Sequence, residues 1–387
     1  MPHLHKMELN RRDSITAIER SILAFEDDVD GASEPASHEF SFRIAKEQSA
    51  GPFRDIWASL ALASMNARCD KGSVVAWGQH DWLQLTSDDP SVVNESSIPF
   101  TPAGLFAVGA DLPIVTDDEL RLPLDASRVT DWLTRKHFLL GNGGGRERVI
   151  VEADPDHPIA PTFKSDYYDF ESFKFALKWI RQELEVGASM RRQAIGVEGW
   201  AERLARFLFE IRQNGFEHAS KANSIRLLKV KKWAFTNRIE AAKWASAFPQ
   251  LESYIERSYP EAGGAFFYEA SISDFGAGIV DGFLASPKGA AYGTHQREEV
   301  VDLLLHSQLS SKSNDPNAGK GIEDALWAAQ GMGAFVSLRT GEFWKFQDSS
   351  AGELFGLRDC RPTEKLATVT GTHWQIIYPG FPTDRRT

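Results

Sequence analysis

The alternation of helical and strand patterns across residues 197–380 is the feature that most constrains the fold of this chain. The helical segments repeat apolar residues every three to four positions, whereas the strand segments carry short apolar or alternating runs. Because the two kinds of element are interspersed, we expect an α/β (α+β) fold. The predicted helices cover residues 197–220, 237–258 and 320–330, and the predicted strands cover residues 225–230, 265–273, 334–339 and 366–378.

The first half of the chain predicts a second, smaller α/β unit. A helical pattern at residues 13–27 precedes an acidic loop, and a strand, a helix and a strand follow at residues 38–44, 53–67 and 73–77. Patterns from residue 81 to residue 169 are mixed. The length of 387 residues fits two domains, since a domain takes roughly 100–200 residues. The predicted organisation is an N-terminal helix and linker (1–38), an N-terminal α/β domain with a hypothesised regulatory role (39–169), a helical connector (170–198) and a second domain (199–380).

The charge of the chain bears on its partners. The formal net charge of -11 argues against a general nucleic-acid-binding surface, because binding to phosphate backbones requires an excess of Lys and Arg. One basic cluster, formed by Arg226, Lys229, Lys231 and Lys232, is interpreted as the solvated face of a strand. The sequence therefore gives no indication of a nucleic-acid partner.

Cysteine usage and hydropathy predict a cytoplasmic protein. Cys69 and Cys360 are the only cysteines, too few for a disulfide framework or a cysteine-based zinc site. The N-terminal residues lack the apolar segment of a secretory signal. No apolar run approaches the ~20 residues of a membrane span. We therefore expect a soluble protein in a reducing compartment, without a membrane partner.

Glu210, Asn214 and His218 recur every four residues in the helix predicted at residues 197–220. This spacing places them on one helix face. The asparagine offers a carbonyl oxygen, which is the kind of hard ligand that Mg²⁺ prefers. A carboxylate one turn earlier can accept a proton from an attacking water. The alternative is an ordinary polar helix face, with a structural role for His218 at the helix end.

Asp274 follows the strand predicted at residues 265–273 and begins a D-x-G-x-G turn with Gly276 and Gly278, followed by Ile279. A carboxylate at this place can accept a hydrogen bond from the exocyclic amine of adenine. The glycines allow the backbone to approach a ligand without an intervening Cβ. The alternative is a simple Asp-Gly turn at the end of a strand.

Two further motifs follow in order. Gly319, Lys320 and Gly321 open the helix predicted at residues 320–330, and Lys312 precedes them. A helix N-terminus presents unpaired N–H groups and a positive dipole end to phosphates, and either lysine can add a direct charge. Thr372 begins the last strand, where its hydroxyl can reach an adenine edge directly or through water. The alternative for the glycines is a loop that leads into a helix.

The order of these four motifs resembles the N, G1, G2 and G3-like boxes of the GHKL superfamily, which includes gyrase, a heat-shock chaperone, MutL and histidine kinases. The resemblance implies a two-layer α/β sandwich of the Bergerat type over residues 199–380. Its helices would cover one face of a mixed sheet, and ATP would lie between the helices and a lid between Gly278 and Gly319. The resemblance implies that Glu210 is catalytic, that Asn214 binds Mg²⁺, and that the nucleotide contacts are Asp274, Gly276, Gly278, Ile279, Lys312, Gly319, Lys320, Gly321, Thr372 and His218.

The sequence departs from the family in two places. Ile322-Glu-Asp follows Gly321 where Gly-Leu is familiar, and the helical insert between Val230 and Gly264 is larger than in minimal members. These departures concern the lid and the phosphate contacts more than Asn214 and Asp274.

The resemblance leaves three functions open. We favour Mg²⁺-dependent ATP hydrolysis that drives a lid or dimer switch, because Glu210 stands where hydrolysing members carry their general base. A self-phosphorylating histidine kinase is disfavoured, since residues 170–199 contain no histidine. Phosphorylation of a partner's Ser or His is one alternative, and a module that binds ATP without hydrolysing it is another. A protein partner is expected, and a homodimer is a hypothesis taken from the family.

Overall fold

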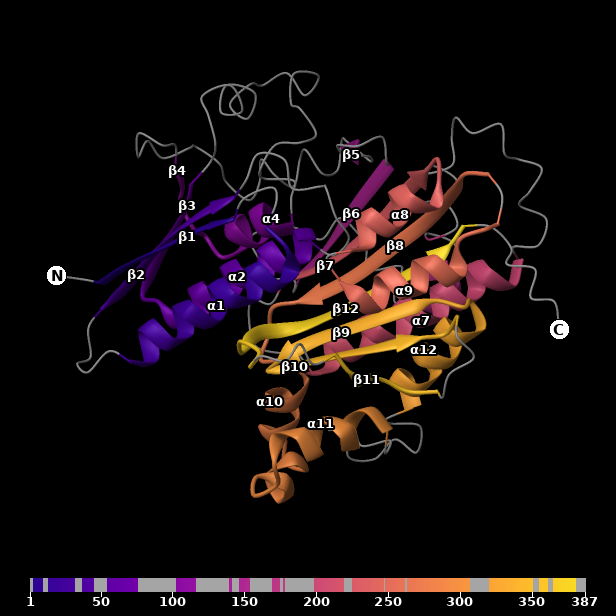
Figure 1. Ribbon diagram of the computed structural model, residues 1–387. Coiled ribbons are helices and arrows are strands. Elements are labelled where there is room, and N and C mark those ends of the chain that lie inside the picture. The colour runs from indigo at the N-terminus through magenta and orange to yellow at the C-terminus, as the bar shows by residue number, and fades with distance from the viewer. Residues whose placement is uncertain are drawn as a thin grey trace.

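The computed structural model of the 387-residue chain describes most of its helices and strands. These elements build two sheets of different kinds, with helices packed against both (Figure 1). The described residues are 3–9, 13–31, 37–44, 54–75, 102–115, 139–140, 146–153, 169–174, 177, 198–218, 225–246, 248–261, 263–306, 320–350, 355–360 and 365–380.

The first sheet is parallel and contains the N-terminal strands in the order β1-β2-β3-β4. Parallel neighbours need a crossover connection, and a helix supplies it between each pair of consecutive strands. The strands are β1 (His3–Leu9), β2 (His38–Ile44), β3 (Lys71–Val75) and β4 (Ile114–Val115), and the helices are α1 (Ile15–Asp30), α2 (Arg54–Arg68) and α4 (Pro102–Gly109).

The second sheet is antiparallel in every described pairing and has the order β11-β10-β9-β12-β8-β7-β6-β5. The last strand of the chain, β12, lies between β8 and β9, so the long connection from β8 to β9 crosses over it. The strands are β5 (Leu139–Leu140), β6 (Arg146–Ala153), β7 (Ile225–Phe235), β8 (Ala265–Asp274), β9 (Phe335–Gly341), β10 (Phe343–Asp348), β11 (Arg358–Asp359) and β12 (Val369–Pro379).

Helices cover both faces of this large sheet. Alternate residues of a strand point to opposite faces, and β7 therefore gives Val230 to one core and Trp233 to the other. One face packs against α7, α10, α11 and α12, and the other against α8, α9 and the N-terminal helices. The bounds are α7 (Glu198–His218), α8 (Arg238–Ala245), α9 (Pro249–Ser258), α10 (Ile279–Leu284), the 3-10 turn η4 (Gly289–Tyr292), α11 (Arg297–His306) and α12 (Lys320–Gly331).

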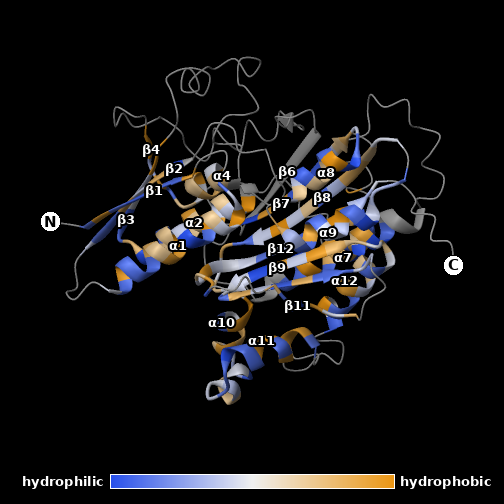
Figure 2. Cartoon of the chain, viewed as in Figure 1, coloured by the Kyte–Doolittle hydropathy of each residue, from blue (hydrophilic) through white to orange (hydrophobic). Residues whose placement is uncertain are grey.

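The N-terminal helices are anchored to the large sheet by buried contacts. Figure 2 shows hydrophobic colour through the middle of α2 and along α4, as their burial requires. Trp57 of α2 meets Trp344 of β10 edge-on, with ring centroids 5.0 Å apart. Arg339 of β9 donates to Glu19 of α1 over 2.8 Å, and both side chains are buried. The N-terminal elements and this face of the sheet therefore share one core.

The sheet arrangement corrects two expectations. The expected mixed sheet is wrong for the large sheet, which is antiparallel, because β12 separates β8 from β9 and pairs antiparallel with both. The expected two layers account for only one face, since the N-terminal helices, α8 and α9 cover the other. The chain as a whole is nevertheless a mixed α/β protein with one parallel and one antiparallel sheet.

The predicted boundary between residues 169 and 170 does not separate the two sheets. β6 pairs with β7 from Glu147 to Ala153, so a strand from the first half extends the large sheet. A further strand, β1, lies inside the region expected to hold only a helix and a linker. The partner of β6 begins only at Ile225, so no local pattern within residues 81–169 predicts this pairing.

Most predicted elements are confirmed within a few residues. No element was predicted between the strand at residues 265–273 and the helix at residues 320–330, whereas α10, η4 and α11 lie within residues 279–306. α10 and η4 are too short to show a helical repeat. The confirmed helices are α1, α2, α7 and α12, with α8 and α9 in the predicted insert, and the confirmed strands are β2, β3, β7, β8, β9 and β12.

The basic cluster on β7 is not a solvated face. Arg226, Lys229 and Lys231 are buried, and only Lys232 is half-buried. β7 pairs on both sides, with β6 and β8, and both faces of the sheet are covered. The Lys231 ammonium lies 3.9 Å from the ring centroid of Trp233, a cation–π contact that offsets part of the cost of burial.

Candidate functional site

Asp274 ends the central strand β8 in a buried position. β12 and β7 flank it, so that Thr372 stands opposite on one side and Arg226 on the other. Burial raises the pKa of the Asp274 carboxyl to about 6, although the Gly276 N–H, Arg226 and Thr372 favour its charged form. The Gly276 N–H donates to Asp274 Oδ1 over 3.1 Å. This buried acid is less stable when ionised than an exposed aspartate.

Two glycines with positive φ close the backbone around this acid. Gly278 has a φ of 83°, and Gly371 has a φ of 88° in a part of β12 where the register against β9 shifts. A Cβ on Gly371 would lie 2.0 Å from the Asp274 carbonyl oxygen, a distance that no real contact permits. A Cβ on Gly278 would lie 3.0 Å from Thr340 Oγ1. The glycines thus allow β12 and the turn after β8 to approach each other closely.

Thr340 of β9 ties these two backbone segments together. Its hydroxyl accepts a hydrogen bond from the Ile279 N–H at 3.2 Å and donates to the Gly371 carbonyl at 3.0 Å. Thr340 Oγ1 is also 3.5 Å from Thr372 Oγ1. The predicted residues Asp274, Gly276, Gly278, Ile279 and Thr372 therefore form one cluster at the end of β8.

Glu210 and Asn214 of α7 meet the start of α12. A Cβ on Gly321 would lie 3.1 Å from Glu210 Oε2 and 3.1 Å from Asn214 Nδ2, so both side chains face this glycine. The Arg206 guanidinium holds Glu210 Oε1 at 3.1 Å. Among the described residues, Asn214 Nδ2 is buried without a hydrogen-bond partner. A buried polar atom of this kind is costly unless a further group satisfies it.

The two clusters lie on the same face of the large sheet. Ile279 begins α10 directly after Gly278, and both β8 and α10 contact α7. Lys320 is the first residue of α12 and is exposed. Lys312 and Gly319 lie outside the described residues, and so does the side chain of His218. Their predicted roles at the site stay predictions.

Sequence reasoning missed three residues of the Asp274 cluster, namely Arg226, Thr340 and Gly371. Arg226 was noted only as part of a basic cluster, because its place opposite Asp274 depends on strand register. Gly371 stands between two threonines, and a glycine inside a strand pattern is a signal for a bulge or a close backbone approach. Thr340 has no signal of its own in the sequence.

The N-terminal unit reaches the back of the Asp274 cluster. Phe275 follows Asp274 directly, and its ring lies 4.7 Å from the ring of Phe106 on α4 and 5.4 Å from the ring of His373. His373 is fully buried, and desolvation lowers its pKa to about 3, so it is neutral. The Thr370 N–H donates to Ser64 Oγ of α2 over 3.3 Å.

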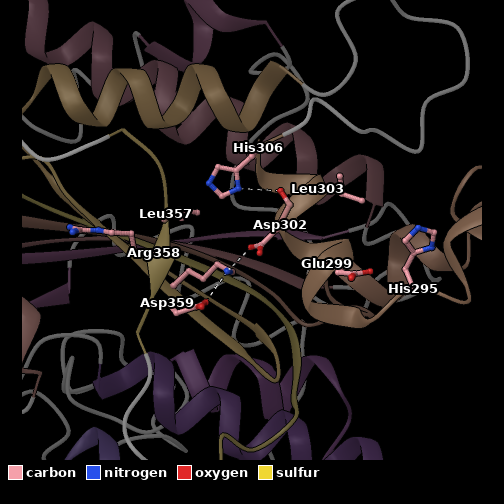
Figure 3. A pocket seen from close by; sticks show the side chains of 9 residues that line it. His295, Glu299, Asp302, Leu303, His306, Leu357, Arg358 and Asp359 are labelled. Atoms are coloured by element: carbon pink, nitrogen blue, oxygen red, sulfur yellow. Dashed lines mark hydrogen bonds and ion pairs between the residues drawn. The ribbon is translucent and has the colours of Figure 1, made fainter.

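A separate cavity of about 740 Å³ lies between α11, β10 and β11 (Figure 3). Lys345 donates to Asp302 and Asp359 over 2.8 Å each. Burial alone would lower the pKa of Lys345, but these two aspartates outweigh it and raise that pKa. None of the predicted site residues that the structure describes lines the cavity. The lining residues are His295, Glu299, Asp302, Leu303, His306, Lys345, Leu357, Arg358 and Asp359.

A comparison of the chain with protein-family models, curated proteins and solved structures finds no match. Within the described residues, none of the helices combines the length and the apolar character needed to cross a membrane.

Proposed function

We propose that this chain binds ATP together with Mg²⁺ at the Asp274 and Asn214 clusters and hydrolyses it. The observation that carries the proposal is the buried Asp274 carboxyl, which stands beside Thr372 in a junction that only glycine can build. A buried acid that destabilises the folded state, held where two backbone segments approach closely, is typical of a group that binds a ligand. The GHKL resemblance gives this ligand as adenine.

The α7–α12 contact supplies the opposite end of the proposed site. α12 is a helix of 12 residues whose first residues are Lys320 and Gly321, and a helix N-terminus favours the negative charge of phosphates. Gly321 keeps the space next to Asn214 and Glu210 open. Asn214 would hold Mg²⁺ through its amide oxygen. The Nδ2 atom of the same amide, which has no hydrogen-bond partner among the described residues, would then lie beside a polar group of the ligand. Mg²⁺ would neutralise charge on the phosphates.

Glu210 is the proposed general base. Its carboxylate is largely shielded, with 15% of the side chain exposed, and it faces the start of α12. The ion pair with Arg206 orients one carboxylate oxygen and leaves Oε2 toward Gly321. An oriented carboxylate at this place can accept the proton of a water that attacks the terminal phosphate.

The Glu210→Ala variant is expected to bind ATP but to lose phosphate release by about 100-fold or more, as a lost general base does. Binding would be measured by calorimetry with Mg²⁺ and turnover by a phosphate-release assay. Glu256→Ala is the matched control, because Glu256 is an exposed acid on α9, across the large sheet from α7. Equal phosphate release by Glu210→Ala and wild type would contradict the assignment.

Two other outcomes would redirect the proposal. If wild type binds ATP without releasing phosphate, the site is that of a kinase acting on a partner's Ser or His, or of a switch that only binds. A transfer assay with labelled ATP and candidate partner proteins separates these two. If wild type does not bind ATP, the proposed site is wrong, whatever the likeness of its motifs.

Nucleotide affinity is expected to fall as pH drops through about 6. The adenine amine donates a hydrogen bond, so the charged Asp274 carboxylate accepts it more strongly than the neutral acid does. Burial sets the Asp274 pKa at about 6, and the charged form is lost below that value. Calorimetric titrations from about pH 7.5 to about pH 5 would measure this loss. An affinity that is flat over this range would contradict the role of Asp274.

A further inference from the structure

Two histidines on β1 and one aspartate on α1 converge at the outer edge of the parallel sheet. His5 Nδ1 lies 2.9 Å from Asp28 Oδ2, and His3 Nε2 lies 3.4 Å from the same oxygen. One ligand atom from each of the three side chains lies within 4.8 Å of the other two. No predicted site residue belongs to this cluster.

The local sequence explains why these groups meet. His3 and His5 are two positions apart on a strand, so their side chains project from the same face of β1. α1 packs against this face, where the His5 ring meets Phe25 of α1 edge-on at 5.2 Å. Asp28 follows Phe25 by three residues, and such residues are neighbours on a helix surface. The cluster is thus fixed by a strand and a helix rather than by a loop.

A fourth side chain orients His5. His38, at the start of the neighbouring strand β2, places its Nδ1 atom 2.9 Å from His5 Nε2. Histidines that bind a metal through one ring nitrogen usually hold the other in a hydrogen bond, which fixes the tautomer and the ring orientation. When His5 Nε2–H donates to His38, the lone pair on His5 Nδ1 faces the Asp28 carboxylate. His5 Nδ1 and Asp28 Oδ2, 2.9 Å apart, would then both be acceptors, and a cation bound to both atoms would remove their repulsion.

We propose that His3, His5 and Asp28 bind a divalent transition-metal ion, for which Zn²⁺ is the probe. Tetrahedral Zn²⁺ with bonds of about 2.0–2.1 Å separates its ligand atoms by about 3.3 Å, close to the two contacts of Asp28. Two imidazoles and a carboxylate suit Zn²⁺ better than Mg²⁺ or Ca²⁺, which take all-oxygen sites. Three protein ligands leave one coordination position for water or an external ligand.

The cluster is accessible from solvent. The side chains of His3 and Asp28 are 59% and 56% exposed, so the ion can enter from solvent.

The site is independent of the proposed ATP site. β1 is the edge strand of the parallel sheet, whereas the proposed ATP site lies on the antiparallel sheet. Metal bound here would join β1 to α1, and thereby stabilise the N-terminal unit by mass action. Titration with Zn²⁺ in the absence of nucleotide therefore tests this inference without testing ATP binding.

The test is a calorimetric titration of the tag-free full chain with Zn²⁺ at about pH 7.5, where free imidazoles are neutral. We expect one saturable site in wild type, and an affinity at least about tenfold lower in His3→Ala and in Asp28→Asn, as for the loss of a ligand. Both residues are half exposed, so neither change should unfold the chain. His295→Ala is the control, because His295 is an exposed histidine outside the cluster.

The melting temperature gives a second measurement. Zn²⁺ should raise it in wild type and in His295→Ala, and the rise should shrink in His3→Ala and Asp28→Asn. The inference is overturned if wild type shows no saturable site, or if His3→Ala and Asp28→Asn bind Zn²⁺ as wild type does.

Discussion

Replacing Asp274 with asparagine is expected to stabilise the protein while abolishing nucleotide binding. The gain in stability arises because burial raises the pKa of Asp274 in the folded protein to about 6, from its usual value of 3.8. The carboxyl therefore favours the folded state below pH 3.8, and this contribution is lost as pH rises through about 6. An asparagine avoids that loss, which amounts to about 1–3 kcal/mol near neutral pH.

The same replacement removes the acceptor of the proposed adenine contact. The Gly276 N–H donates to Oδ1, so an asparagine would keep its oxygen there and present its NH₂ group to the ligand. Two donors would then face each other in a buried place. The expected loss of affinity is about 100-fold or more, as when a buried polar group is left unpaired.

Urea unfolding and ATP calorimetry on the same Asp274→Asn protein separate the two effects. The gain in the free energy of unfolding should be largest near neutral pH and vanish near about pH 4, where wild type is also neutral. Glu256→Gln is the control for an acid-to-amide change, and it should alter neither property, because Glu256 is exposed on α9. An Asp274→Asn protein that is no more stable and binds ATP normally would falsify the assignment.

The Gly371→Ala variant is expected to lose about 3 kcal/mol or more of unfolding free energy, which is exceptional for adding one methyl group. Two costs add. An alanine at a φ of 88° is strained, and its Cβ would lie 2.0 Å from the Asp274 carbonyl oxygen, a backbone atom that cannot move aside alone. Relief of the clash requires β12 to move away from β8, which would also separate Thr372 from Asp274.

Gly263→Ala is the matched control for this steric argument. Gly263 has a φ of 86°, nearly that of Gly371, but a Cβ there would have no heavy atom within 4 Å. It should cost only the backbone strain of about 1–2 kcal/mol. Urea midpoints of the two variants give the difference directly. Equal losses of unfolding free energy in the two variants would show that the steric clash at Gly371 adds nothing to the cost of backbone strain.

Local patterns were sufficient for the central elements of the large sheet. β8 and α7 were predicted within a few residues, because a strand or helix that packs on a core carries a clear apolar period. Asp274, Glu210 and Asn214 could be singled out because they have motif neighbours at fixed spacing. The roles proposed for these three residues follow from the residue types that stand near them in the sequence.

Contacts between segments that are far apart in the sequence could not be predicted from local patterns. Thr340 joins Ile279 to Gly371 only because β12 inserts between β8 and β9, an order that no local pattern encodes. The buried state of Lys229 and Lys231 likewise depends on which strands flank β7 and which helices cover it. A lysine-rich strand has the same sequence at the centre of a sheet as at its edge.

The shared core between α1, α2 and the large sheet has a consequence for how this chain can be divided. A fragment that began after α4 would uncover Trp344 and leave the Arg339 guanidinium without the Glu19 carboxylate. Loss of this buried ion pair, together with exposure of the apolar side chains that α1, α2 and α4 cover, would remove a large share of the stability of a typical domain. The large sheet is therefore not an exchangeable cassette, and recombination between genes would have to transfer both halves together.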